Sequence, residues 1–305
     1  MSGRGWAAFA AMSLIWGVPY LFIKLAVAHV PPASLVFLRT GLGALILIPL
    51  AAARGQLRPL LPAWKPVLAY TAIEVSIPWL LLNHAETRLS SSLAGLLLAA
   101  VPLVGAVLGW VTRTDRLDWR RVAGLAIGIA GVAALVGLDL GTGDIGALLE
   151  MLGTAVCYAV GPFILARYLS HLPGLGVVAA SLVLTAIVYA VPAALQLPGL
   201  RLPGDALVQV VGSVVVLAVV CTVIAFLTFF KLIEEVGPAR ATVITYLNPA
   251  VAIGLGVAFL GEPFTAGIAV GFVLVLLGSA LATRRSRPVA TPDPAAAPAQ
   301  ASSPS

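Results

Sequence analysis

The sequence predicts an all-α membrane protein with ten transmembrane helices, arranged as two inverted five-helix repeats. Three observations support this fold class: the composition, the spacing of apolar runs and a weak internal duplication. Hydrophobic residues make up 60% of the 305 residues and charged residues only 10%, whereas a soluble domain carries about 25% charged residues. The composition therefore excludes a water-soluble fold.

The predicted helices follow from runs of apolar residues that end at polar, Pro or Gly breaks. A helix needs ~20 mainly apolar residues to cross ~30 Å of hydrocarbon. In chain order the runs cover residues 6–28, 32–53, 66–82, 89–111, 119–137, 145–168, 177–195, 206–230, 239–260 and 264–282. Residues 288–305 are rich in Pro, Ala and Ser, which predicts a disordered cytoplasmic tail.

The basic residues predict the orientation in the membrane. The formal net charge is +6, but Lys and Arg occur singly or in pairs at the ends of apolar runs, which does not indicate nucleic-acid binding. With a cytoplasmic N-terminus, 14 of the 18 Lys and Arg residues fall on the cytoplasmic side. We therefore expect an even number of spans in the plasma membrane, with both termini in the cytoplasm.

The two halves of the chain are related by a weak internal match. A shift of 147 residues places Pro102 on Pro249 and Gly109 on Gly256, and it lays Asp115 over Glu262. The predicted repeats cover residues 6–137 and 144–283. Because each repeat contains five spans, the second must be inverted relative to the first, which is an architecture of secondary transporters.

The opening and the end of the second half also resemble a known family. Leu14-Ile15-Trp16-Gly17, followed by Lys24, Pro31-Pro32 and Arg39, is similar to the start of EamA-like proteins of the drug/metabolite transporter superfamily. The segment from Arg240 to Glu262 resembles the family's helix with a central Pro and a closing acidic residue. This resemblance spans residues 6 to 283 and implies a ten-helix, inverted-repeat exporter of amino acids, related metabolites or drugs. In the first half Asp115 matches the acidic position less well.

Glu74 is the deepest ionisable residue of the predicted spans. An ionisable side chain in the membrane interior costs about 3 kcal/mol or more, so it needs a partner, a water-filled cavity or a function. Pro78 lies four residues later, and a proline there leaves the Glu74 carbonyl without its helical hydrogen bond. We expect Glu74 to bind substrate or couple transport to protons; the alternative is a protonated, purely structural Glu.

Lys24 and Arg39 flank the predicted hairpin at Pro31-Pro32 at similar depths. Together they could bind the carboxylate of a substrate. Both side chains could instead reach the membrane surface, and Glu150 at a comparable depth offers a structural ion pair.

The other candidates are aromatic or polar residues and prolines inside the predicted spans. Buried Tyr and Trp usually need a polar partner, so they are candidates for lining a substrate cavity, with Asn248 as a polar contact or a helix-helix hydrogen bond. Prolines that interrupt a span expose backbone carbonyls, although a packing kink explains any single one. The aromatic candidates are Trp16, Trp79, Tyr158 and Tyr246, and the predicted kinks are at Pro19, Pro78, Pro102, Pro162 and Pro249.

The sequence contains no phosphate-binding Gly-rich motif, and its His residues lie at helix ends, so we expect no cofactor, no metal and no enzymatic activity. The expected partners are a small-molecule substrate and membrane lipid. The leading interpretation is a secondary active exporter of amino acids or similar metabolites, with proton coupling as one option. The alternatives are a multidrug or cationic-compound exporter and a non-transporting membrane assembly factor. The oligomeric state stays open, a homodimer being one option.

Overall fold

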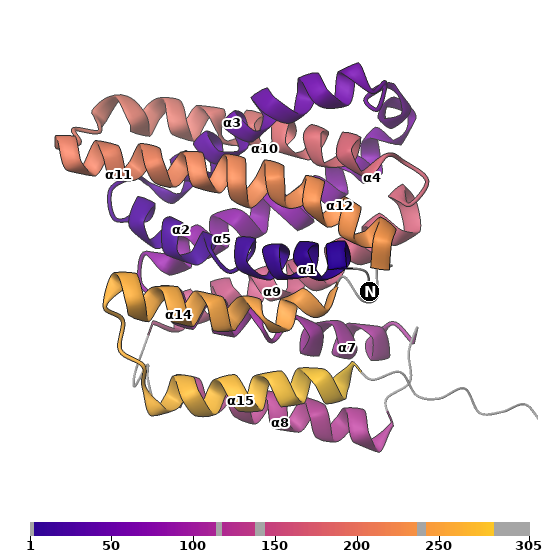
Figure 1. Cartoon of the computed structure of the whole chain (residues 1–305), viewed down its shortest axis with the longest axis vertical. Coiled ribbons are helices and arrows are strands. Elements are labelled where there is room, and N and C mark those ends of the chain that lie inside the picture. Colours follow the sequence, from indigo (N-terminus) through magenta and orange to yellow (C-terminus); the bar gives the residue numbers. More distant parts are fainter. Residues whose placement is uncertain (1–2, 114–117, 138–143, 237–241, 284–305) are drawn as a thin grey trace, which may run out of the picture.

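A computed structural model describes residues 3–113, 118–137, 144–236 and 242–283 of the chain. Every regular element in these residues is a helix (Figure 1). The predicted C-terminal tail, Asp115 and Arg240 lie outside the described residues.

The first half contains helices that correspond to the first five predicted spans. In chain order they are α1 Gly3–Ile15, α2 Pro19–Val27, α3 Pro32–Ala53, the 3₁₀ helix η1 Arg58–Ala63, α4 Trp64–Tyr70, the π-helix η2 Thr71–Ser76, α5 Ile77–Glu86, α6 Ser91–Leu98, α7 Val101–Val111 and α8 Trp119–Leu135.

The second half contains helices that correspond to the last five predicted spans. Its elements are α9 Ile145–Ile164, the π-helix η4 Leu165–Leu169, α10 Gly174–Gln196, the 3₁₀ helix η5 Leu197–Gly199, α11 Gly204–Val215, the π-helix η6 Val216–Ile224, α12 Ala225–Val236, the 3₁₀ helix η7 Thr242–Tyr246, α14 Asn248–Leu260 and α15 Ala266–Ala282.

Seven helical stretches of the described residues are long and apolar enough to cross a membrane, and shorter apolar helices accompany them. The stretch that contains Glu74 runs from Arg58 to Glu86, whereas the sequence predicted residues 66–82. The predicted end was too early because His84 and Glu86 look like loop residues in the sequence. The chain is an all-helical membrane protein.

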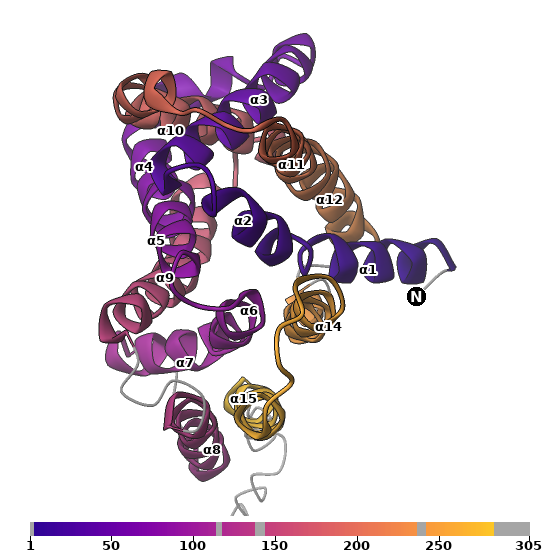
Figure 2. The same ribbon diagram turned by 90° about the vertical axis from the view of Figure 1, so that its left-hand side faces the viewer.

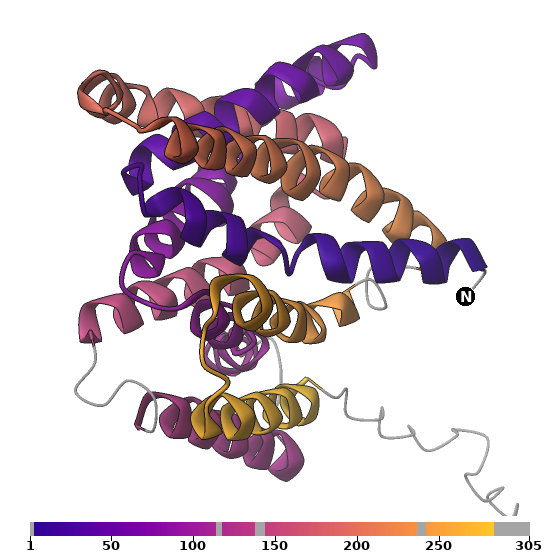
Figure 3. The same ribbon diagram turned by 60° about the vertical axis from the view of Figure 1, so that its left-hand side comes forward.

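Three of the prolines mark helix breaks. Pro19 begins α2 after a break at residues 16–18, and Pro102 and Pro249 occupy the second positions of α7 and α14. Figure 3 shows the first of these breaks in the indigo part of the chain. A proline fits the first helical turn because the backbone N–H that it lacks would have no partner there.

Pro162 differs from these three prolines because its helix continues past it. It lies inside α9, which continues to Ile164 before the π-helical segment η4. The proline removes one backbone hydrogen bond, and neighbouring helices and local π-helical adjustments can compensate for such a loss in a membrane helix.

Neighbouring helices come from different halves of the chain (Figures 1 and 2). Helix α3 packs along α10, α8 along α15, and α6 along α14. Helix α1 packs along α12, α2 packs along α11, and α5 packs against α9. The largest hydrophobic core cluster combines residues of both halves, including Ile23, Leu96, Met151, Leu217 and Ile253.

The bundle has two ends, the Glu262 end and the N-terminal end. The Glu262 end carries the connections at residues 28–31, 87–90, 197–203 and 261–265, and the N-terminal end carries the start of α1 and the connections at residues 54–57 and 170–173. The two ends lie at the left and right of Figure 1, respectively.

Candidate functional site

Arg39 lies in the middle of α3 and is only 7% exposed. Its guanidinium stacks 3.7 Å from the centre of the Trp79 ring, and its Nε donates a hydrogen bond to Thr222 Oγ1 at 3.1 Å. The Nη nitrogens make no hydrogen bond to any described residue. The planar fork is thus held in position by Nε and the indole while its two outer nitrogens stay available, as the binding of a carboxylate requires.

Helix α5 presents a buried polar face to this arginine. Trp79, Asn83 and Glu86 follow each other at spacings of four and three residues, so they lie on one side of the helix. Glu86 is completely buried, and neither carboxylate oxygen has a hydrogen-bond partner among the described residues. Sequence reasoning missed Glu86 because it ended the helix at Leu82. The four- and three-residue spacing after Trp79 was the signal that could have identified it.

Glu86 belongs to a group of charges that interact across the bundle. It interacts electrostatically with Lys24, Arg39 and Glu262, and none of these lies within the 4.0 Å range of an ion pair with it in the described structure. Tyr20 and Tyr158 are also close enough to this group to interact with it. We call Lys24, Arg39, Trp79, Glu86 and Tyr158 the central cluster.

Lys24 has a defined structural role. Its Nζ donates two hydrogen bonds of 2.7 Å, to the backbone carbonyls of Glu86 and Leu89. The Glu86 carbonyl lies at the C-terminal end of α5, where helical acceptors lack partners and a positive charge is favourable, and Leu89 lies in the connection that follows. Two of the three ammonium donors are thereby used, which leaves Lys24 less free for a substrate than Arg39.

Glu74 lies in the π-helix η2, in which the backbone N–H of Ile77 bonds to the carbonyl of Ala72, five residues earlier. Its side chain is half-buried, and Oε2 is buried without a hydrogen-bond partner among the described residues. The carboxyl packs against Gly161 of α9 so closely that a Cβ there would collide with it. Tyr70 and Tyr158 interact with it electrostatically. Glu74 therefore lies at the contact between the third helical stretch and α9.

Two other candidates, Trp16 and Asn248, lie beside the break between α1 and α2. Trp16 packs against Phe229 with ring centres 4.7 Å apart. With its amide nitrogen facing the backbone, Asn248 donates to the carbonyls of Ser13 at 3.1 Å and Ile244 at 3.0 Å. The break leaves the Ser13 carbonyl without a helical partner, so Asn248 makes a helix-helix hydrogen bond.

Tyr246 bonds through its hydroxyl to Thr283 at 2.9 Å. The structure thus groups Arg39, Trp79, Tyr158 and Lys24 in the centre, and it places Trp16, Asn248 and Tyr246 around the broken helices α1 and α14.

Glu150 pairs with residues other than those considered from the sequence. Its carboxylate accepts from Arg88 and from His84, with the His84 contact at 2.8 Å. Arg88 also contacts Asp144 at 2.9 Å. The proposed ion pair of Glu150 with Lys24 or Arg39 is therefore wrong, because α5 extends far enough to bring His84 and Arg88 beside α9.

Glu262 connects the two halves at the same end. Its carboxylate accepts from the backbone N–H groups of Ser91 at 2.7 Å and Ser92 at 2.9 Å, and from the Ser92 hydroxyl. These groups form the first turn of α6, where unpaired N–H donors and the helix dipole favour an anion. A carboxylate from the second half thus caps a helix of the first half.

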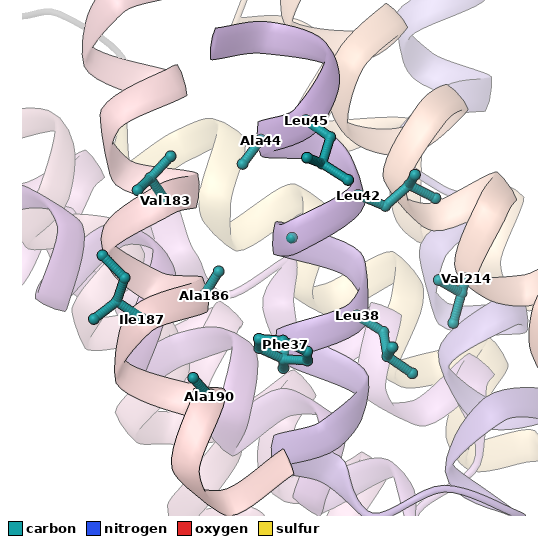
Figure 4. A pocket seen from close by; sticks show the side chains of 11 residues that line it. Phe37, Leu38, Leu42, Ala44, Leu45, Val183, Ala186, Ile187, Ala190 and Val214 are labelled. Carbon is teal, nitrogen blue, oxygen red and sulfur yellow. The ribbon is translucent and has the colours of Figure 1, made fainter. Parts of the chain in front are cut away.

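A groove of about 590 Å³ on the bundle surface is not suited to a charged solute. Figure 4 shows its wall of apolar side chains from α3 and α10, together with Val214 of α11. Leu45 and Ile187 at its rim are 74% and 63% exposed, as expected for side chains that face lipid tails.

Comparisons with known proteins agree with this architecture. The chain is 30% identical over 302 residues to "Uncharacterized inner membrane transporter YedA" of Escherichia coli, covering 93% of this chain and 94% of that protein. It is 24% identical to "Probable amino-acid metabolite efflux pump" of Salmonella typhimurium, with 87% and 90% of the two chains covered. A solved crystal structure with 23% identity matches the fold with a TM-score of 0.64, covering 93% of this chain and 97% of the other.

The family model of the EamA-like transporter family matches this chain twice, over residues 3–137 and 145–284. This is a family of membrane transporters and not of enzymes. The two matches also indicate a duplicated architecture. The chain belongs to the EamA-like transporter family of the drug/metabolite transporter superfamily.

Proposed function

We propose that this protein is a secondary active transporter that exports amino acids or related small metabolites across the plasma membrane. The observation that carries the proposal is the buried guanidinium of Arg39, whose Nη nitrogens have no partner among the described residues. A buried arginine fork without a carboxylate of its own is suited to bind the carboxylate of a solute. The name of the Salmonella typhimurium relative supports amino acids as the cargo.

The proposed transport mechanism uses two inverted five-helix repeats with both termini in the cytoplasm. Three structural correspondences support it. The fourth helical stretch of each half is broken just before a proline, Pro102 or Pro249. The third stretch of each half contains a π-helical segment, η2 or η6. Helices α3 and α10, which hold equivalent places in the two halves, pack against each other. Inverted repeats allow alternating access to a central site.

Glu74 is the proposed coupling residue. Its buried, unpartnered Oε2 lies against α9, in a π-helical segment of the kind often found at functional sites. A carboxyl in such a place can bind a proton on one side of the membrane and release it on the other. A proton gradient would thereby bias the direction of transport.

The test measures the flux of radiolabelled amino acids from vesicles that contain the purified protein, with and without an imposed pH gradient. We expect the wild-type protein to export amino acids, and Arg39→Gln to lower the flux about tenfold or more. Arg201→Gln removes an exposed arginine between α10 and α11 and should leave the flux unchanged. Glu74→Gln should retain exchange but lose its acceleration by the gradient.

Absence of any amino-acid flux in the wild type would overturn the proposed function. An unchanged gradient response in Glu74→Gln would remove Glu74 from the mechanism but leave the cargo proposal intact.

A further inference from the structure

The carboxyl of Glu86 has no role in the proposed transport step. It is completely buried, and both oxygens lack a hydrogen-bond partner in the described structure. A buried carboxyl without partners costs several kcal/mol, so a structural role would normally supply donors to it. Lys24, the nearest candidate for that role, instead directs two of its donors to backbone carbonyls. The fold thus buries the Glu86 carboxyl without giving it a hydrogen-bond partner among the described residues.

The central cluster separates opposite charges. Arg39 and Glu86 interact electrostatically, yet they are too far apart to form an ion pair. Arg39 keeps the free Nη nitrogens, and Glu86 keeps two free oxygens. The same cluster therefore contains hydrogen-bond donors on Arg39 and acceptors on Glu86 that have no partner, and the two groups do not bond to each other.

Ionisable groups of both signs surround Glu86. Lys24, Arg39 and Glu262 interact with it electrostatically. A solute that carries one carboxylate and one ammonium group can pair with Arg39 through the first and with Glu86 through the second, so that neither buried group is left without a partner.

Aromatic side chains accompany Arg39 and Glu86. Trp79 lies under the Arg39 guanidinium, and Tyr20 and Tyr158 interact electrostatically with each other. Tyr20 is also near enough to Glu86 to interact with its carboxyl. Aromatic rings provide an apolar surface for the carbon skeleton of a solute and can interact with an ammonium group through their faces.

We propose that the central cluster binds zwitterionic α-amino acids, with the substrate carboxylate on Arg39 and the substrate ammonium on Glu86. This inference rests on the proposed function and makes it more specific. It assigns to Glu86 the rejection of carboxylic acids that lack an ammonium group, and to Arg39 the rejection of amines that lack a carboxylate.

The first experiment needs no substitution. Vesicles with the full-length protein are loaded with the standard amino acids, with 3-phenylpropanoate and with 2-phenylethylamine, and the efflux of each compound is measured by mass spectrometry. The last two compounds are phenylalanine without its ammonium group and without its carboxylate. We expect the wild type to export amino acids about tenfold or more faster than either analogue, because each analogue leaves either Arg39 or Glu86 without a partner. Export of 3-phenylpropanoate at the rate of phenylalanine would overturn the inference.

The second experiment exchanges the two charges separately. Gln is close in shape to Glu, so Glu86→Gln should preserve the fold. It should lower the preference for phenylalanine over 3-phenylpropanoate about tenfold. Arg39→Gln should lower the preference over 2-phenylethylamine instead. Glu150→Gln removes a carboxylate that pairs with Arg88 at the Glu262 end, and it should change neither preference.

The outcomes separate this inference from the proposed function. Amino-acid export with an unchanged preference in a folded, monodisperse Glu86→Gln variant would overturn the role of Glu86 while amino-acid export stands. If the wild type exports none of the amino acids, the proposed function fails and this inference fails with it.

Discussion

The two ends of the bundle differ in the polar contacts that join the two halves of the chain. At the Glu262 end, charged and polar side chains of one half contact the other half in addition to the apolar core. Glu262 caps α6, Arg88 in the connection after α5 contacts Asp144 and Glu150, and Gln209 donates to the Leu25 carbonyl at 3.2 Å.

At the N-terminal end the halves meet mainly through apolar side chains. One cluster joins Met12 of α1 to Leu232 of α12, and a second joins Tyr70 to Leu169. A polar contact at this end runs from Arg121 Nε to the Ala282 carbonyl at 2.8 Å.

The difference shows how the two ends of a transporter of this kind can be controlled. Hydrogen bonds to a carboxylate depend on distance and angle, so they are either formed or broken. Apolar contacts depend on buried area and tolerate small displacements. We therefore expect changes of single charges to lower stability at the Glu262 end. At the N-terminal end we expect changes of side-chain volume to do so.

The largest effect is expected from Glu262→Ala. This substitution leaves the backbone N–H groups of Ser91 and Ser92 without their acceptor, at a cost of about 2–3 kcal/mol in the free energy of unfolding. The Tm of the purified protein in detergent measures the loss. Glu234→Ala removes an exposed glutamate near the N-terminal end and should change the Tm little. Equal losses in the two variants would contradict the contrast between the ends.

A smaller loss is expected from Met12→Ala at the N-terminal end. Met12 is completely buried between the halves, and the cavity left by its truncation should lower the free energy of unfolding by about 2 kcal/mol. Met12→Leu nearly preserves the volume and should restore most of the stability. If Met12→Leu were as unstable as Met12→Ala, volume would not be what holds this end together.

The smallest effect concerns Asp144, which caps α9 and contacts Arg88. The backbone N–H of Ala147, followed by the side chain of Arg88, holds the pKa of this carboxyl below its ordinary value of 3.8. Its contribution to stability is therefore fully present above pH 3.8 and is lost as the pH falls through the lowered pKa. The Tm of the wild type should fall with pH in this window more steeply than that of Asp144→Asn.

Asp205→Asn provides the matched control for this pH dependence. Asp205 is an exposed aspartate in the first turn of α11, and no described residue forms an ion pair with it. If Asp205→Asn altered the dependence of Tm on pH as much as Asp144→Asn, the contact between Asp144 and Arg88 would have no special effect on stability.

The sequence by itself determined the class of the protein and the approximate course of its helices. Helix α3 covers residues 32–53 as predicted, because the length and hydrophobicity of a membrane-spanning helix are local properties of the chain. The breaks before Pro19, Pro102 and Pro249 could be predicted for the same reason, since a proline acts on its own turn of helix. The family followed from short motifs that the family model then matched.

Only the tertiary structure decided what the polar residues contact. The hydrogen bonds of Lys24 to the end of α5, of Glu262 to α6 and of Asn248 to Ser13 all depend on which helices lie side by side. The burial of Glu86 depends in addition on the true end of α5, which the sequence placed four residues too early. A single sequence contains the depth of a charge along its helix but not the direction in which the helix faces. Partners across the bundle therefore emerge only when the helices pack.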